Sequence, residues 1–578
     1  MTEVIDPLIL VILAVLVIAV ATAIGPKLKI AGPLILVLLG LGVSLLPFVH
    51  VPEIDPEIIL VGVLPPLLYS AAVSLPAIEF RRDFAPIAGL SVLLVLVSAI
   101  VLAYFFLAVI PGLPFLLALA LGAILSPTDA VATSIVKRLG ISRRVVTVLE
   151  GESLLNDATS LVILRVAVAG AAVGSVQTGG IAGAFVWGVI VAVVVGAVVG
   201  YLNLRFRSLI HNSAANTAIG FVVPFVAYLP TEHLGGSGLV AAVVAGIVTG
   251  QGSLRWSTPE QRMSDRLNWR TVELMLEGAV FLVMGLELKD ILDRNINSDS
   301  GIAQGIGIAA VALGIVLVVR GVYVSILIWL QTRRARGRQR ARLEQVDERL
   351  KAAAEDPGRV ARVHPVHHGR RMDRMRASLS RAYADLAYYE ASPLGWKHGA
   401  VIVWAGMRGV VTLAAAQTLP RDTPERPLII FVAFLVAVGS LVIQGFTLPW
   451  IVKALGLRTD NAADAVGLGD QRSLDDELRD AAASALADAH VTRRDGSAFA
   501  SDLLRGVGAR LTEPPDDETT AFARDVLELR LALIAHMRTR LIEVSSGGEY
   551  STAALRHALA ELDADELSLR LRLDDDDE

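Results

Sequence analysis

Long apolar runs separated by short polar stretches follow one another through most of the chain. A membrane-spanning helix needs about 20 mostly apolar residues, and about thirteen runs approach or exceed that length. They predict spanning helices at residues 7–24, 31–48, 57–75, 84–110, 114–138, 145–172, 181–204, 213–230, 235–252, 271–290, 301–330, 399–419 and 427–453. The pattern indicates an all-α polytopic membrane protein.

Positive charges between these runs alternate along the chain. Loops on one side carry several Lys and Arg residues, and the intervening loops carry few, each near acidic residues. Since cytoplasmic loops are enriched in Lys and Arg, the alternation predicts an N-terminus outside and a C-terminus in the cytoplasm. We expect a multi-pass protein of the plasma membrane. The basic loops hold Lys27, Lys29, Arg81, Arg82, Lys137, Arg138, Arg143, Arg144, Arg205, Arg207, Arg255, Arg262, Arg266 and Arg270.

Two segments lack the spanning pattern and divide the chain. We predict transmembrane helices 1–11 in residues 1–330, a basic cytoplasmic insert at 331–398, helices 12 and 13 in 399–455, and a helical cytoplasmic tail at 456–578. We expect the tail to be regulatory, with a small molecule or a protein as its ligand.

The insert begins with an arginine-rich stretch. One interpretation is that these arginines bind anionic lipid headgroups. The simpler interpretation is a positively charged cytoplasmic flank that leads into a helical hairpin. The stretch contains Arg333, Arg334, Arg336, Arg338 and Arg340.

Composition and missing motifs narrow the function. Hydrophobic residues make up 54% of the chain and charged residues 19%, at a mean hydropathy of +0.59, which argues against a large soluble enzyme. Cysteine is absent, which excludes disulfides, thiolate metal sites and a cysteine nucleophile. The sequence has no GxxxxGK[ST], HExxH or GxSxG motif. We therefore expect no enzyme activity, no cofactor and no nucleic-acid partner, and interpret His364, His367 and His368 as a polar loop.

A first polar break, Ser126-Pro127-Thr128-Asp129, interrupts the fifth apolar run. Proline removes a helical hydrogen bond and disfavours helical geometry in the residue before it. An interrupted helix would free backbone carbonyls to line a cavity, with Thr128 offering an oxygen and Asp129 facing the positive end of a half-helix. The alternative is a simple proline kink.

A second polar motif, Glu152-Ser153-Leu154-Leu155-Asn156-Asp157, lies in the sixth run. A carboxylate at the bilayer centre costs about 2.5–3.5 kcal/mol on insertion scales. At helical spacing, Ser153, Asn156 and Asp157 converge on one point, and oxygen ligands suit hard cations. We predict a monovalent-cation and proton site at Asp157. The alternative is polar contact between helices.

The stretch 406–412, Gly-Met-Arg-Gly-Val-Val-Thr, interrupts the twelfth run in the same way. It includes Arg408 and Thr412. The fifth and twelfth runs occupy matching places if helices 1–6 and 8–13 are inverted repeats around helix 7. Discontinuous helices in matching positions indicate the substrate site of a secondary transporter.

Two further charges lie within apolar runs. Arg320 needs a counter-ion if it is buried, and Glu152 is the preferred partner. Alternatively, Arg320 extends to the cytoplasmic interface. Glu277 either pairs with a basic residue or gates a cytoplasmic funnel.

Together, the residues 126–129, the Glu-Ser-x-x-Asn-Asp motif, Arg408-Gly409 and the stretch Leu64-Pro65-Pro66-Leu67-Leu68 resemble the cation:proton antiporter-1 family of bacterial NhaP-type antiporters and sodium/proton exchangers. The resemblance covers about residues 7–453 without the insert. It implies a homodimer in a lipid membrane, with a dimerisation domain and a mobile ion-binding core.

The resemblance also implies roles for single residues. Asp157 would carry cation and proton alternately, with Ser153 and the Thr128 backbone as cation ligands. Asn156 and Asp129 would shape the site between crossed half-helices. Glu152 and Arg320 would form a structural ion pair, and asparagine at position 156 resembles the electroneutral branch.

Position 70 departs from the family pattern. Many bacterial members have an acidic residue after the Pro-Pro-Leu-Leu-aromatic stretch, where this chain has Ser70. Our leading hypothesis is electroneutral Na⁺/H⁺ exchange at Asp157, with elevator-like access. Because Ser70 leaves selectivity among Na⁺, K⁺ and Li⁺ open, the first alternative is a K⁺/H⁺ antiporter regulated by the tail. An alternative of another class is a membrane sensor or interaction protein.

Overall fold

The computed structural model describes residues 2–28, 31–46, 55–173, 178–210, 212–296, 302–335 and 393–457, with shorter stretches between 379 and 389 and between 484 and 570. Over these residues the chain is helical and has no strand. It divides into two compact units, Met1–Ala463 and Asp464–Glu578. Most of the insert and the tail, with the three histidines of the insert, lies outside the described residues.

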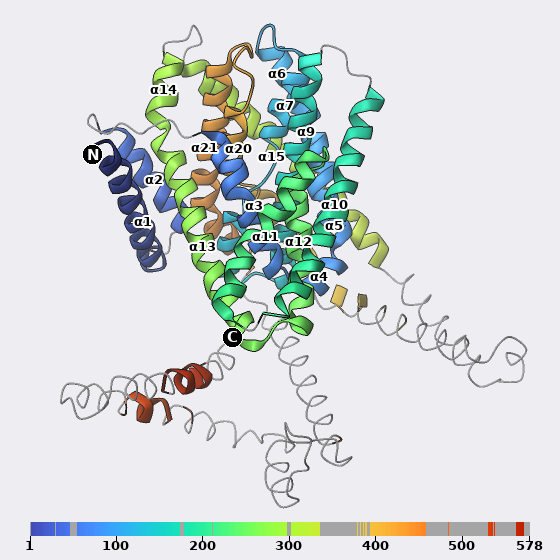
Figure 1. The fold of residues 1–578 in the computed structure, drawn as a ribbon. Helices are drawn as coiled ribbons and strands as arrows, with labels where there is room; N and C mark the ends of the chain where they lie inside the picture. Colours follow the sequence, from blue (N-terminus) through green and yellow to red (C-terminus); the bar gives the residue numbers. More distant parts are fainter. Residues whose placement is uncertain are drawn as a thin grey trace, which may run out of the picture. The chain divides into compact units, whose positions relative to one another are not determined.

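The first unit contains two groups of helices that pack mainly within themselves (Figure 1). We call one group the flanking helices. They are α1 (Thr2–Leu28), α2 (Gly32–Ser44), the π-helix η1 (Ile58–Val63), α3 (Leu64–Ser74), α10 (Thr178–Arg207), α11 (Ser213–His233), α12 (Gly238–Trp256) and α13 (Pro259–Leu286).

We call the other group the crossing helices. They are α4 (Ala77–Arg82), α5 (Phe84–Ala88), the π-helix η2 (Gly89–Leu93), α6 (Leu94–Val109), α7 (Phe115–Ile124), α8 (Val131–Arg138), α9 (Arg143–Val173), α15 (Ile302–Ala335), α19 (Trp396–Trp404), α20 (Val410–Gln417) and α21 (Arg426–Ala454). Between the groups in sequence, α14 (Leu288–Ile296) follows α13 and packs on α21. We refer below to the α14 end and the α4 end of the unit (Figure 1).

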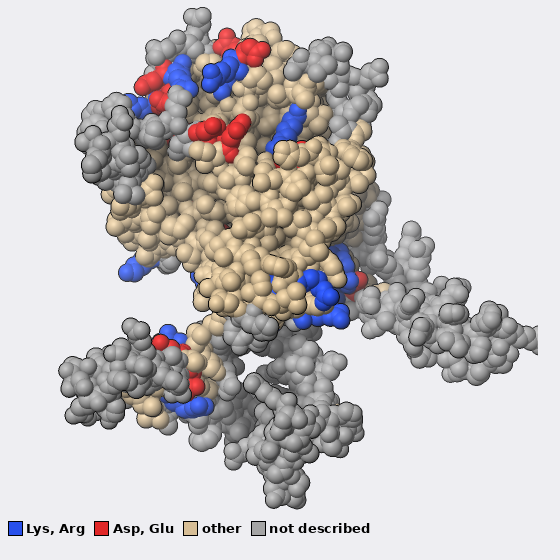
Figure 2. Space-filling model, viewed as in Figure 1, with Lys and Arg blue, Asp and Glu red and all other residues tan. Residues whose placement is uncertain are grey.

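Six helices of the described residues are long and apolar enough to cross a membrane. Shorter apolar helices accompany them, so the predicted total of about thirteen spans stays a prediction. Figure 2 shows a broad uncharged band across the middle of one face, with charged side chains toward its two ends. The six spans are Phe84–Val109, Arg143–Ala171, Val186–Arg207, Ser213–His233, Ile302–Gln331 and Arg426–Ala454.

The predicted start of the tenth helix at residue 271 is wrong, since α13 begins at Pro259. Thr258 caps this helix: its hydroxyl accepts from the Gln261 N–H, and the Gln261 side chain accepts from the Thr258 N–H. The polar first turns were interpreted as a loop because they lack an apolar run. The helix also ends earlier than predicted, at Leu286, and α14 begins separately.

Two apolar segments are interrupted near their middles. Residues 125–130 separate α7 from α8, and residues 405–409 separate α19 from α20. The second break is shorter than the polar motif from which it was predicted, because Thr412 lies inside α20. The two interruptions bring four helix ends together among the crossing helices.

Candidate functional site

The two interrupted segments meet through their backbones. The Asp129 N–H donates to the Met407 carbonyl at 2.7 Å, which joins the two breaks directly. A Cβ atom on Gly409 would overlap the Asp129 carboxylate, so glycine is needed at this contact. A side chain at Gly406 would likewise press on Arg320, with its Cβ 2.8 Å from Nε. The glycines of the second motif thus permit the close crossing.

Asp129 lies at the positive ends of two half-helices. Its Oδ1 accepts the Val131 N–H at 3.1 Å, at the beginning of α8. The same carboxylate borders Gly409, which precedes the first residue of α20. Helix N-termini carry partial positive charge, so this anion stabilises both.

Arg408 lies at the opposite pair of helix ends. It is almost completely buried, and its Nε donates to the Leu125 carbonyl, just past the end of α7, at 3.1 Å. Its Nη1 donates to the Gly406 carbonyl, after the end of α19. Its backbone N–H donates to Ser440 Oγ at 2.9 Å. The guanidinium therefore compensates the partial negative charge of two helix C-termini.

Glu152 and Arg320 form a buried ion pair. Their side chains are 1% and 2% exposed, and both arginine Nη atoms donate to the carboxylate, the Nη2–Oε2 distance being 2.8 Å. Arg320 also donates to the Ile402 carbonyl from Nε at 3.0 Å and from Nη2 at 2.9 Å. The pair links α9, α15 and α19.

A short chain of hydrogen bonds leads from this pair toward Asp157. The Thr128 hydroxyl donates to Glu152 Oε1 at 3.3 Å, and Asn156 Nδ2 donates to Thr128 Oγ1 at 2.7 Å. Within the part of the chain that the structure describes, the buried Asn156 Oδ1 has no hydrogen-bond partner. The Asn156 amide is thereby oriented with one acceptor atom still available.

Asp157 differs from the other charged groups at the crossing. Its side chain is half-buried, and among the described residues none forms a hydrogen bond or ion pair with its carboxylate. Its nearest electrostatic influence is the carboxylate of Asp129. Ser153, one helical turn earlier on α9, is buried. Carboxylate, amide and hydroxyl oxygens form a donor set that suits a hard monovalent cation or a proton.

Ser70 and Glu277 lie on the flanking helices. Ser70 is buried, and its hydroxyl donates to Glu273 Oε2 at 3.5 Å. Glu277 follows one turn later on α13 and interacts electrostatically with Asp129 and Glu273. Thr412 is buried in α20, and its hydroxyl has no partner among the described residues.

Several contributors were missed by the reasoning from sequence. Ser91 Oγ donates to the Glu152 carbonyl at 3.2 Å, and Ser440 holds the Arg408 backbone. Single serines in apolar runs give no distinguishing signal. Glu273 carried a signal, because it lies four residues before Glu277 and so on the same helix face.

Comparison with known proteins places the chain among ion exchangers. The family model described as "Sodium/hydrogen exchanger, transmembrane" matches residues 12–347 and 375–454. The chain is similar to an uncharacterized Na⁺/H⁺ exchanger of Mycobacterium tuberculosis, with 27% identity over 97% of this chain and 96% of the relative. An uncharacterized Na⁺/H⁺ exchanger of Escherichia coli is 39% identical over 42% of this chain and 46% of its own length.

Two further similarities concern ion range and fold. A "Sodium, potassium, lithium and rubidium/H(+) antiporter" of Bacillus subtilis is 32% identical over 45% of this chain and 40% of its own length. The fold is similar to that of the sodium proton antiporter MjNhaP1 of Methanocaldococcus jannaschii, with a TM-score of 0.56 and 18% identity over 78% of this chain and 99% of that one.

Proposed function

The chain belongs to the sodium/hydrogen exchanger family, whose members are multi-pass secondary transporters, and from that premise we propose that it exchanges one monovalent cation for one proton at Asp157. Na⁺ is the proposed cation. Ser153, Asn156 and the Thr128 backbone assist as oxygen ligands.

The observation that carries this proposal is the charge balance at the crossing. Glu152 and Arg320 neutralise one another, and Asp129 and Arg408 each face the helix ends of opposite polarity. One carboxylate, that of Asp157, is left to be neutralised by a mobile ion. A site with one such charge binds either one cation or one proton, which supports electroneutral exchange.

We further propose elevator-like access within a homodimer. The crossing helices carry the site and would move as a body past the flanking helices, which would form the dimer contact. The N-terminus would lie outside and the C-terminus in the cytoplasm of a plasma-membrane protein. Separate packing of the two groups supports such movement.

The test is the dissipation of a preset pH gradient by added cations in proteoliposomes. Wild type should dissipate the gradient on addition of Na⁺, and Asp157→Asn should not, since it removes the charge that both ions share. Ser160→Ala, which changes another buried polar position of α9, is a matched control that should retain exchange. Normal exchange by folded Asp157→Asn would refute the proposal.

A K⁺/H⁺ exchanger regulated by the tail is the second candidate. The neutral hydroxyl of Ser70 and the ion range in the name of the B. subtilis relative both favour it. Dissipation by K⁺ in preference to Na⁺ would select this candidate, and truncation after residue 456 would test the tail. A reconstituted protein that transports neither ion would favour a membrane sensor instead.

A further inference from the structure

Polar contacts between the crossing and flanking helices occur at the α14 end. Arg165 on α9 forms an ion pair with Glu232 near the end of α11, and its Nη2 donates to the Tyr228 hydroxyl at 3.3 Å. Gln417, the last residue of α20, donates from Nε2 to Glu287 Oε2 at 2.8 Å. Glu287 directly follows α13, so this bond also joins a crossing helix to a flanking helix.

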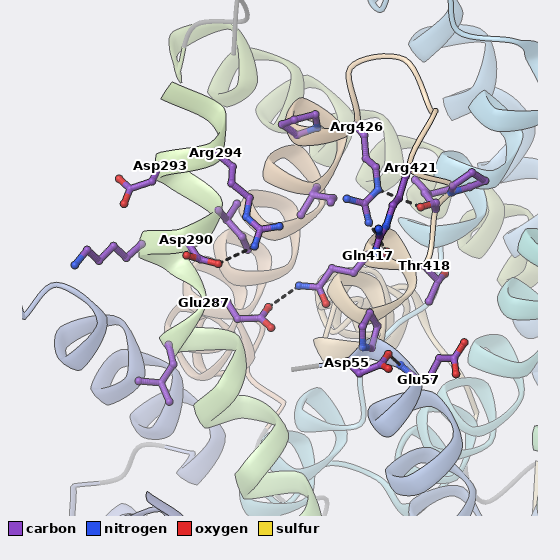
Figure 3. Close-up of a pocket in the computed structure, with 18 of the residues that line it drawn as sticks. Asp55, Glu57, Glu287, Asp290, Asp293, Arg294, Gln417, Thr418, Arg421 and Arg426 are labelled. Atoms are coloured by element: carbon purple, nitrogen blue, oxygen red, sulfur yellow. Dashed lines mark hydrogen bonds and ion pairs between the residues drawn. The ribbon is translucent and has the colours of Figure 1, made fainter. Parts of the chain in front are cut away.

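The second contact lies beside a cavity of about 820 Å³ (Figure 3). Glu287 and Gln417 point toward each other across it, from the α13–α14 junction and from α20. The cavity is lined by the end of α2, the beginning of η1 and the loop between α20 and α21. The charge pattern of the loops predicts that all these segments face outward.

Packing on the two sides of the site differs. Between the crossing and Gln417, the α20 residues Leu413, Ala414, Ala415 and Ala416 are at most 2% exposed. On the α4 side, Ala130 is exposed and Asp129 is half-buried. The polar contacts across the groups therefore coincide with the side on which the site is covered.

We propose that the Arg165–Glu232–Tyr228 and Glu287–Gln417 contacts form a latch that holds the Asp157 site closed at the α14 end. This proposal rests on the proposed exchange function, because a latch has a purpose only if the site must open to both sides. Movement of the crossing helices past the flanking helices breaks both contacts, and breaking them shifts the population toward the state open at the α14 end.

The natural absence of cysteine makes the test direct. Ala130→Cys reports access from the α4 side, and Ala416→Cys reports access from the α14 side. Each is labelled with a membrane-impermeant maleimide in sealed vesicles of both orientations. The latch is weakened by Glu232→Gln, which keeps an acceptor for the Gly238 N–H, and by Gln417→Met, which keeps the side-chain length.

Loss of each contact should slow labelling at residue 130 and speed labelling at residue 416, by about threefold to tenfold for each contact. The matched control is Asp290→Asn, which lines the same cavity but pairs with Arg294 within α14 and should leave both rates unchanged. The single latch variants suffice if the double variant does not fold.

Unchanged rates at both reporters, in a protein that still exchanges ions, would overturn the latch and leave the proposed function standing. Faster labelling at both reporters would also overturn it, because that pattern means local loosening and not alternating access. Failure of the wild type to exchange any cation in the proteoliposome assay would refute the proposed function itself.

Discussion

The buried pair of Glu152 and Arg320 should stabilise the protein through mutual dependence. In Arg320→Met, the Glu152 carboxylate keeps the Thr128 hydroxyl as its remaining side-chain donor, at 3.3 Å, and stays buried with an uncompensated charge. Removing one partner of a buried pair costs about 3–5 kcal/mol. We expect a loss near the upper end of that range.

Glu152→Gln should cost less than Arg320→Met. The glutamine oxygen still accepts from the guanidinium, and Arg320 keeps its two hydrogen bonds to the Ile402 carbonyl. The loss should lie near the lower end of the range, at about 3 kcal/mol. The double variant leaves neither charge unpaired, so its loss should be smaller than the sum of the two single losses by about 2–3 kcal/mol.

Unfolding in mixed detergent micelles, titrated with SDS and followed by circular dichroism, measures these differences. Lys137→Met is a suitable control, because Lys137 and Glu150 form an ion pair in which the lysine is 57% exposed. An exposed pair contributes at most about 1 kcal/mol. Additive losses in the Glu152 and Arg320 variants would refute the assigned coupling, and a Lys137→Met effect of equal size would refute its dependence on burial.

Three further predictions concern the crossing, the insert and the ion stoichiometry. Gly409→Ala should reduce exchange about tenfold or more, because its Cβ overlaps the crossing carboxylate; Gly439→Ala, where the added Cβ meets nothing within 4 Å, should transport normally, and equal rates would contradict the assigned contact. Tyr388→Phe removes the 3.0 Å hydrogen bond to the buried Asp83 and should lower stability by about 1 kcal/mol in the same titration. Burial and then the charge of Asp83 raise the pKa of the Tyr388 phenol, so it stays protonated and this loss should be constant between about pH 5 and pH 9; a loss that disappears within that window would argue against the bond. Exchange at Asp157 should have the same rate with and without an imposed membrane potential, and a potential-dependent rate would exclude one-for-one exchange.

The sequence predicted features that depend on local pattern. Proline and glycine within apolar runs indicated both helix interruptions, because backbone geometry at these residues is a local property. Two charges in otherwise apolar helices suggested that Glu152 and Arg320 would need one another. The positions of the long helices followed from runs of apolar residues.

Contacts between distant residues were beyond such reasoning. The Asp129 N–H meets the Met407 carbonyl, and every residue type presents these same backbone groups. Arg408 was identified as a charge at a break, but the Leu125 carbonyl that it contacts depends on how two helix ends are placed. The tenth helix was shortened because its first turns are polar on all sides, and its capping residue Thr258 outweighed the lack of an apolar run.

The distribution of these contacts favours movement of the crossing helices as a body. Asp129, Arg408, Glu152 and Arg320 all lie on crossing helices, and their printed partners lie there too. Sliding this group past the flanking helices would break none of those bonds, whereas moving one half-helix alone would expose the buried pair at a cost of about 3–5 kcal/mol. The contacts that do cross between the groups are partly exposed, with Arg165 at 47% and Glu232 at 24%, and each stabilises the closed arrangement by only about 1 kcal/mol. Two conformations separated by such a small difference would both be populated, which is what exchange between the two sides of a membrane requires.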